Sequence, residues 1–117
     1  EFAVCVPVIL MIVFGAIEAA SMLFLRQALI QSAYESVKIA VKADADNSDA
    51  LVAAQAVAAG RRIDNLVVTF APADIRDAAK GDLIRVTVSA PGDSNSLIPF
   101  GPLKNRIISA DAFMVKE

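Results

Sequence analysis

Residue types that perform acid–base, nucleophilic or metal chemistry are scarce in this 117-residue chain. Histidine, the commonest general base and metal ligand, is absent. The one cysteine, Cys5, cannot form an internal disulfide or a zinc site. Without histidine a Ser-His-Asp triad cannot form, and the sequence has no Gly-rich phosphate-binding loop. We therefore predict no catalytic, cofactor-binding or metal-binding residues, and we expect that the protein is not an enzyme.

One acidic run, residues 44–49, resembles part of a calcium-binding loop because carboxylates stand at Asp44, Asp46 and Asp49. Such a loop requires Gly at its sixth position and Glu at its twelfth, where this sequence has Asp49 and Gln55. The run is better explained as a solvated junction that ends one helix and supplies an N-cap to the next.

Two charged residues, Glu18 and Arg26, lie within or beside a strongly apolar segment. Ionised groups are rare in hydrocarbon unless they are paired or close to the interface. The two residues are eight positions apart, so about 12 Å of helical rise separates them and they cannot pair within one helix. Either they pair between axially staggered helices of neighbouring subunits, or both lie at the bilayer boundary with Arg26 reaching the interface.

Small residues and a proline mark the same segment. Gly15 and Ala19 form a small-xxx-small pair, which lets two helix backbones approach closely. Pro7 frees the carbonyl of Ala3 and bends the helix, as a harmless kink near the helix start or as a hinge. We predict an assembly interface that includes Pro7, Gly15 and Ala19 together with the two charged residues.

A single long helix has to position these residues. The segment Phe2–Ile17 carries no charge and is apolar on every face, as is typical of a helix in lipid or in a packed protein core. From about Ser21 the pattern becomes amphipathic, and no Gly or Pro interrupts residues 16–45. We predict one helix over residues 1–44, about 65 Å long, whose apolar half, residues 2–25, can cross a membrane.

The remaining residues, 45–117, predict a small head. A second, Ala-rich helix is expected from about Asp49 to Gly60, with a weak apolar face formed by Leu51, Val52, Ala54 and Val57. Strands are expected at 66–70, 83–89 and 104–116, with a helical turn at 75–79 and a loop at 91–102. The predicted fold class is α+β: a hydrophobic helix of about 44 residues and a head of one short helix and a three-stranded antiparallel sheet, packed on the C-terminal half of the long helix.

Several stretches resemble the TadE-like family, pilin-like proteins of tight-adherence (Tad, type IVc) pilus systems. The opening Glu-Phe-Ala-Val with Pro7, followed by Phe-Gly-Ala-Ile-Glu at residues 14–18, is similar to the start of that family. Further similar stretches are Arg-Gln-Ala-Leu at 26–29, the strand at 81–88 and the closing residues 108–117.

The resemblance implies a structural subunit of an extracellular bacterial filament that acts in adhesion or surface attachment. Residues 2–25 would form an inner-membrane span in the precursor and the filament core after assembly. Glu1 and Phe2 would join the interface, with Glu1 neutralising the terminal ammonium of an adjacent subunit. The absence of an initiating Met at Glu1 indicates that a preceding segment was removed or lies outside this sequence.

The implied partners are copies of the same chain, other pilins, the prepilin peptidase, the pilus assembly machinery and, before assembly, the membrane. Nucleic acid is not expected, because the net charge is -2 and acids and bases are intermixed. A different class remains open: a single-pass inner-membrane protein whose periplasmic head is a scaffold or binding module, as in a minor pseudopilin or assembly factor.

Overall fold

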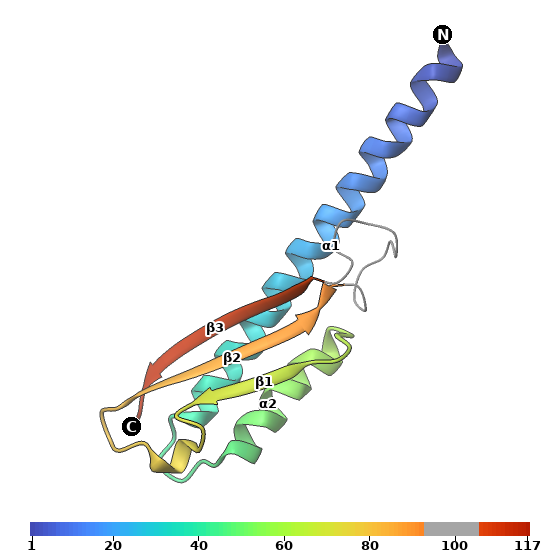
Figure 1. Ribbon diagram of the computed structural model, residues 1–117. Coiled ribbons are helices and arrows are strands. Elements are labelled where there is room, and N and C mark those ends of the chain that lie inside the picture. Colours follow the sequence, from blue (N-terminus) through green and yellow to red (C-terminus); the bar gives the residue numbers. More distant parts are fainter. Residues whose placement is uncertain (93–105) are drawn as a thin grey trace.

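The computed structural model describes residues 1–92 and 106–117. A long helix and a small head make up the described chain, and the N-terminal half of the helix extends away from the head (Figure 1). The overall extents are 68 × 21 × 20 Å. The predicted α+β class is confirmed, with the elements α1 (Phe2–Ala40), α2 (Asn47–Gly60), β1 (Val67–Ala71), the 3₁₀ turn η1 (Ile75–Asp77), β2 (Leu83–Pro91) and β3 (Ile107–Val115).

The three strands form an antiparallel sheet in the order β1-β2-β3. The predicted alternation along β2 is confirmed, because Ile84, Val86 and Val88 are fully buried. Arg85 lies on the opposite, exposed face, where its guanidinium stacks 4.6 Å from the ring centroid of Phe113 on β3. The sheet therefore has one face toward the helices and one face toward solvent, as in a two-layer α+β head.

One stripe of α1 packs against the buried face of the sheet. Its apolar members are Leu25, Leu29, Ala33 and Val37, which belong to the same core cluster as the inward residues of β2. These residues recur every four positions, so they lie on one face of the helix. The head is thus completed by the C-terminal half of α1, and the three strands do not have to bury a core on their own.

A second contact of α1, with α2, consists of small residues. On α2 the buried positions are Ala50, Ala54 and Ala58, spaced one turn apart. The predicted apolar face of this helix was wrong at Val52, which is 63% exposed. The buried row is shifted because Ala side chains let the two helices approach closely, whereas a row of Leu and Val would separate them.

α1 ends at Ala40, four residues before the predicted end at Asp44. The carbonyls at the helix end bond to the C-terminal tail instead of to a further helical turn. The backbone N–H of Glu117 donates to Val41 O at 3.0 Å, and Lys116 Nζ donates to Ala40 O at 3.4 Å. Val41 itself is buried in the core, so the chain turns here without a Gly or Pro.

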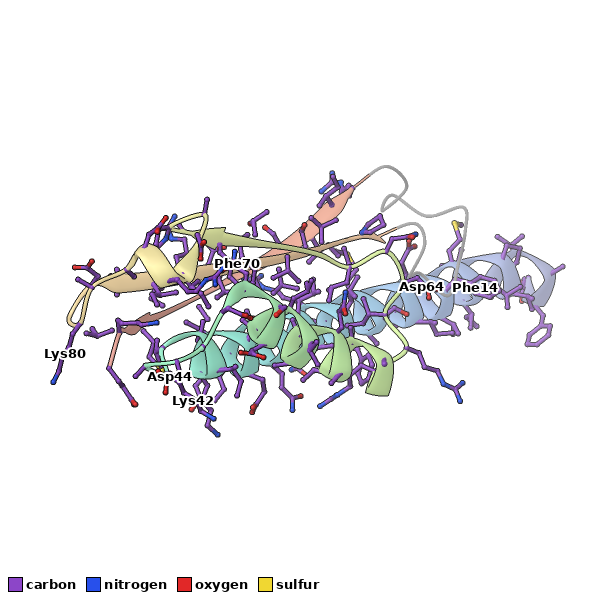
Figure 2. All side chains as sticks on the ribbon, turned by 90° about the horizontal axis from the view of Figure 1, so that it is seen from below. Phe14, Lys42, Asp44, Asp64, Phe70 and Lys80 are labelled. Atoms are coloured by element: carbon purple, nitrogen blue, oxygen red, sulfur yellow. The ribbon has the colours of Figure 1, made fainter. Side chains whose placement is uncertain are left out.

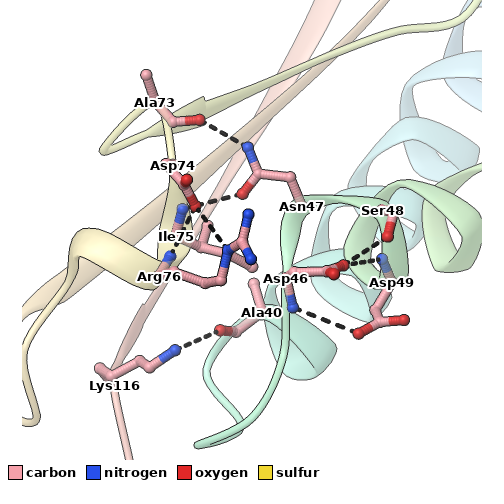
Figure 3. Close-up of polar contacts among 10 residues, drawn as sticks. All are labelled: Ala40, Asp46, Asn47, Ser48, Asp49, Ala73, Asp74, Ile75, Arg76 and Lys116. Atoms are coloured by element: carbon pink, nitrogen blue, oxygen red, sulfur yellow. Dashed lines mark hydrogen bonds and ion pairs between the residues drawn. The ribbon is translucent and has the colours of Figure 1, made fainter.

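Polar contacts at this end of the molecule tie α2 to the β1–β2 connection (Figure 3). Asp46 caps α2 in a capping box with Asp49, so the helix begins at Asn47, two residues before the predicted start. The side chain of Asn47 donates to Ala73 O at 2.7 Å and accepts from the backbone N–H of Ile75 at 2.9 Å. The acidic run is therefore a helix junction, as predicted.

The other strand boundaries differ from the prediction by a few residues. β1 is displaced by one residue, β2 continues to Pro91, and the predicted helical turn is the shorter η1. β3 begins at Ile107, and the predicted start at 104 lies outside the described residues, as does most of the predicted loop at 91–102.

Candidate functional site

The N-terminal half of α1 is apolar and uncovered within the single chain. Every residue from Phe2 to Ile17 is exposed, including Phe2 at 80% and Met11 at 68%. In Figure 2 the side chains around Phe14 surround the helix and do not form one stripe. Among the described residues α1 is the one helix long and apolar enough to cross a membrane. This segment is the largest candidate for an interaction surface.

The free energy of burying the apolar side chains of this segment indicates which surroundings stabilise it. Burial of one large aliphatic or aromatic side chain stabilises by roughly 1.5–3 kcal/mol, so the whole segment represents on the order of 20 kcal/mol. That sum exceeds the typical net stability of about 5–15 kcal/mol for a domain. The segment therefore requires lipid or other apolar helices around it.

Glu18 stands where the exposed half of α1 meets the head. Its side chain is only 8% exposed, and Oε1 has no hydrogen-bond partner among the described residues. Glu18 lies in angular register with Leu25, Leu29 and Ser36, because seven, eleven and eighteen residues are close to whole numbers of helical turns. The carboxylate thus continues the buried stripe of the head toward the apolar half, and it forms no ion pair with Arg26 in the described part of the chain.

A second unsatisfied oxygen lies one turn further. Ser21 Oγ is buried and has no hydrogen-bond partner in residues 1–92 and 106–117, and Ser21 and Glu18 are neighbours on the helix surface. Buried polar groups without partners are rare and costly in native structures, about 1–3 kcal/mol each. At this junction, Glu18 Oε1 and Ser21 Oγ are thus two buried oxygens that lack hydrogen-bond partners among the described residues.

The other predicted interface residues are accessible along the same helix. Glu1, Pro7, Ala19 and Arg26 are exposed. A Cβ atom added at Gly15 would meet nothing within 4 Å outside its own helical turn among the described residues. All seven predicted residues lie on one helix over roughly 38 Å, so one subunit does not bring them together. The assembly interface stays a prediction.

Two grooves flank α1 at the junction. One, of about 550 Å³, lies on the α2 side and is lined by Ile17, Ala20, Ser21, Phe24, Leu25, Arg61, Arg62 and Ile63. The other, also about 550 Å³, lies on the β3 side and is lined by Ala19, Met22, Leu23, Arg26, Arg106, Ile107, Ile108 and Ser109. Each groove therefore joins apolar residues of α1 to two arginines.

The end of α2 places Arg61 and Arg62 beside α1, which sequence reasoning missed. Arg61 donates to Gln31 Oε1 at 2.6 Å and lies 5.5 Å from the ring centroid of Phe24. α2 ends at Gly60, as predicted, and the residue of the cap in left-handed conformation is Arg62, with φ of 56°. The backbone N–H of Ile63 donates to Ala58 O at 2.9 Å, which completes a Schellman-type cap.

Electrostatics at the opposite end of the molecule concern the α2 cap. The Ser48 hydroxyl and the Asp49 amide donate to Asp46, and together they lower the pKa of that carboxyl below its usual 3.8. No group of three or more potential metal-ligating side chains occurs in residues 1–92 and 106–117. The carboxylates here act in caps and turns.

Comparison with known proteins identifies the N-terminal segment. The family model described as TadE-like protein matches residues 1–38, which is almost the whole of α1. The predicted resemblance is therefore confirmed over this segment. No curated protein and no solved structure matches the chain.

Proposed function

We propose, from the TadE-like character of residues 1–38, that this chain is a structural subunit of an extracellular bacterial pilus-like filament. In this proposal the N-terminal halves of α1 bundle in the filament core, the heads face solvent, and the filament acts in adhesion or surface attachment. The precursor lies in the inner membrane and is processed by a prepilin peptidase before the assembly machinery extracts it. The chain has no catalytic role and needs no cofactor.

The observation that carries the proposal is the exposure of α1 on every face from Phe2 to Ile17. A helix that only backs a soluble head would show one buried stripe and one polar face. A helix that is apolar all round is stable in lipid before assembly and among other helices afterwards. The same surface thus serves both states of a subunit that moves from membrane to filament.

Glu18 supports self-association in particular. A buried carboxylate oxygen without a partner is costly, and a cation from another copy would satisfy it. Arg26 is exposed and about 12 Å further along the helix, so an axial stagger of neighbouring helices brings the two together. In a filament with this pairing, Arg26 of each subunit forms an ion pair with Glu18 of its neighbour.

The second candidate is a single-pass inner-membrane protein whose periplasmic head is a scaffold or binding module. The observation that favours it is the position of Glu18 and Arg26 at the end of the apolar half, where both can reach a bilayer interface. In that case α1 is an anchor, and Glu18 needs water or headgroups and not a partner helix.

Electron microscopy of material sheared from the cell surface, with mass spectrometry of the same fraction, separates the two candidates. We expect long filaments in which this chain is a main component. Recovery of the chain only in membranes would contradict the filament proposal and favour the anchored scaffold.

Glu18→Leu tests the role of the carboxylate. We expect filament yield to fall at least tenfold while the amount inserted in the membrane is unchanged, because Leu removes the intersubunit partner and adds apolar surface. Glu35→Gln, which removes a carboxylate from the head, is the matched control and should assemble normally. Wild-type yield from Glu18→Leu would show that the carboxylate has no part in assembly.

A further inference from the structure

Four arginines line the two grooves that flank α1 near the level where its apolar half ends. Arg61 and Arg62 line the groove that includes Ile17, and Arg26 and Arg106 line the groove that includes Ala19. We refer to Arg26, Arg61, Arg62 and Arg106 as the arginine collar. Because α2 runs back along α1 and β3 begins at the same level, arginines far apart in sequence lie beside the same stretch of α1.

Acidic and basic side chains are distributed differently at the two ends of the head. At the collar level Asp64 is the one exposed acid of the described residues, and it has partners of its own. The far end mixes exposed acids, such as Asp44, with exposed cations, such as Lys42 and Lys80 (Figure 2). The collar is thus the cationic end of the head, and it directly adjoins the apolar half of α1.

Arg62 has a backbone conformation that favours glycine. Its φ of 56° places it at the C′ position of the α2 cap, where Gly is the usual residue. Arg at this position adopts an unfavourable backbone conformation, although its side chain forms no hydrogen bond or ion pair with the other described residues. A guanidinium held here at such a cost points to a ligand outside the chain.

We propose that the arginine collar binds the headgroups of anionic phospholipids while α1 lies in the membrane. The inference rests on the membrane-inserted stage of the proposed function and not on filament formation. The apolar floors of both grooves continue the surface of the span, so an acyl chain lies along α1 while its phosphate meets two arginines. Guanidinium groups suit this role because they bind phosphate oxygens in a bidentate manner.

Anionic lipid is favoured over a second copy of the chain as the occupant. The grooves contain both apolar and cationic residues, which matches a phospholipid, whereas a neighbouring copy that brings Glu18 to Arg26 would leave Arg61, Arg62 and Arg106 without an anion. A cation near an anionic membrane surface contributes about fivefold to binding for each residue.

Native mass spectrometry of the full chain in detergent, with equal amounts of phosphatidylglycerol and phosphatidylethanolamine, tests the proposal. We expect the wild type to retain phosphatidylglycerol preferentially. The double variant Arg26→Gln/Arg62→Gly should lose this preference by roughly twentyfold. Arg62→Gly relieves the unfavourable backbone conformation, so the melting temperature of the variant should not fall.

The matched control is Lys42→Gln/Lys80→Gln, which removes the same charge from the far end of the molecule (Figure 2). Its lipid preference should equal that of the wild type. Equal retention of the two lipids by the wild type, or an equal loss in the control, would overturn the proposal. A dimer that the collar variant abolishes, without any lipid preference, would overturn it in favour of a second copy.

The measurement uses the solubilised subunit and needs no filament. A failure of filament assembly in cells would leave the lipid preference intact, and a missing lipid preference would leave filament yield unaffected. The two proposals therefore fail separately.

Discussion

The roles of single residues could be predicted from the sequence at one end of the head but not at the other. The cap at Asp46 follows from local sequence, because Asp at an N-cap with an acidic residue three positions later is a local pattern. The orphan oxygens of Glu18 and Ser21 do not, because their burial depends on how the head lies over α1. Glu18 was predicted as a site residue from its cost in an apolar segment, whereas Ser21 gave no signal.

The Asp46 cap predicts a specific pH dependence. Its pKa in the folded chain is lowered, first by the Ser48 hydroxyl, so the cap stabilises the folded state fully above the unfolded value of 3.8. This stability is lost as the pH falls through the lower folded pKa. We expect Asp46→Ala to lower the melting temperature at pH 6, with the difference from wild type narrowing below about pH 3.8.

Asp46→Asn is the matched control for this cap. Asn keeps an oxygen that accepts from the Asp49 amide but has no titrating group. Its melting temperature at pH 6 should lie close to that of the wild type, with a weaker decline on acidification. A constant gap between Asp46→Ala and wild type from pH 6 to pH 2.5, followed by circular dichroism, would contradict the assignment.

Helix and strand positions were largely predictable, because periodicity is a local property of the sequence. The helix ends were less so. α1 stops at Ala40 because the distant residues Lys116 and Glu117 bond the carbonyls there, and no local pattern reports such a contact. The close contact between α1 and α2, called here the α1–α2 seam, was missed for a similar reason. Its Ala and Ser residues differ too little in hydrophobicity from their neighbours to indicate a buried face.

The seam between α1 and α2 depends on two buried hydroxyls. Ser32 Oγ donates to Ala54 O and Ser36 Oγ donates to Ala50 O, each at 2.9 Å. We expect Ser32→Ala/Ser36→Ala to reduce the free energy of unfolding by about 2 kcal/mol, since each bond contributes about 1 kcal/mol. Denaturant unfolding of the full chain in detergent, followed by circular dichroism, measures the change.

Size at the seam gives a sharper test than hydrogen bonding. Ser36 and Ala50 are both fully buried, so Ser36→Leu has no space and should destabilise by a further 1–3 kcal/mol, roughly, through overpacking. Ser109→Ala on the exposed face of β3 is the control and should have little effect. A Ser36→Leu variant as stable as the wild type would mean that the helices are not in close contact.

The whole molecule combines a head that is complete in itself with a helix half that is not. The head closes its core between the sheet, α2 and the C-terminal half of α1. The N-terminal half of α1 is not covered by any other described part of the chain. This exposure was predictable, because an unbroken apolar run can be recognised without tertiary information. What surrounds that half, lipid or other helices, depends on the state of the assembly and is not a property of one chain.

Gly15 distinguishes these two surroundings. A Cβ added at this position meets nothing within 4 Å outside its own helical turn among the described residues, and replacing Gly in a helix raises helix stability, so Gly15→Leu should fold and insert as well as the wild type. In a bundle of closely packed helices the same side chain forces the backbones apart. We therefore expect Gly15→Leu to reduce the yield of sheared filaments at least tenfold while the membrane-bound amount is unchanged.

Met11→Leu, a volume-conserving change in the same segment, should assemble normally. Normal filaments from Gly15→Leu would place the close helix contact elsewhere on α1, because lipid accommodates Leu at any position and a packed core does not.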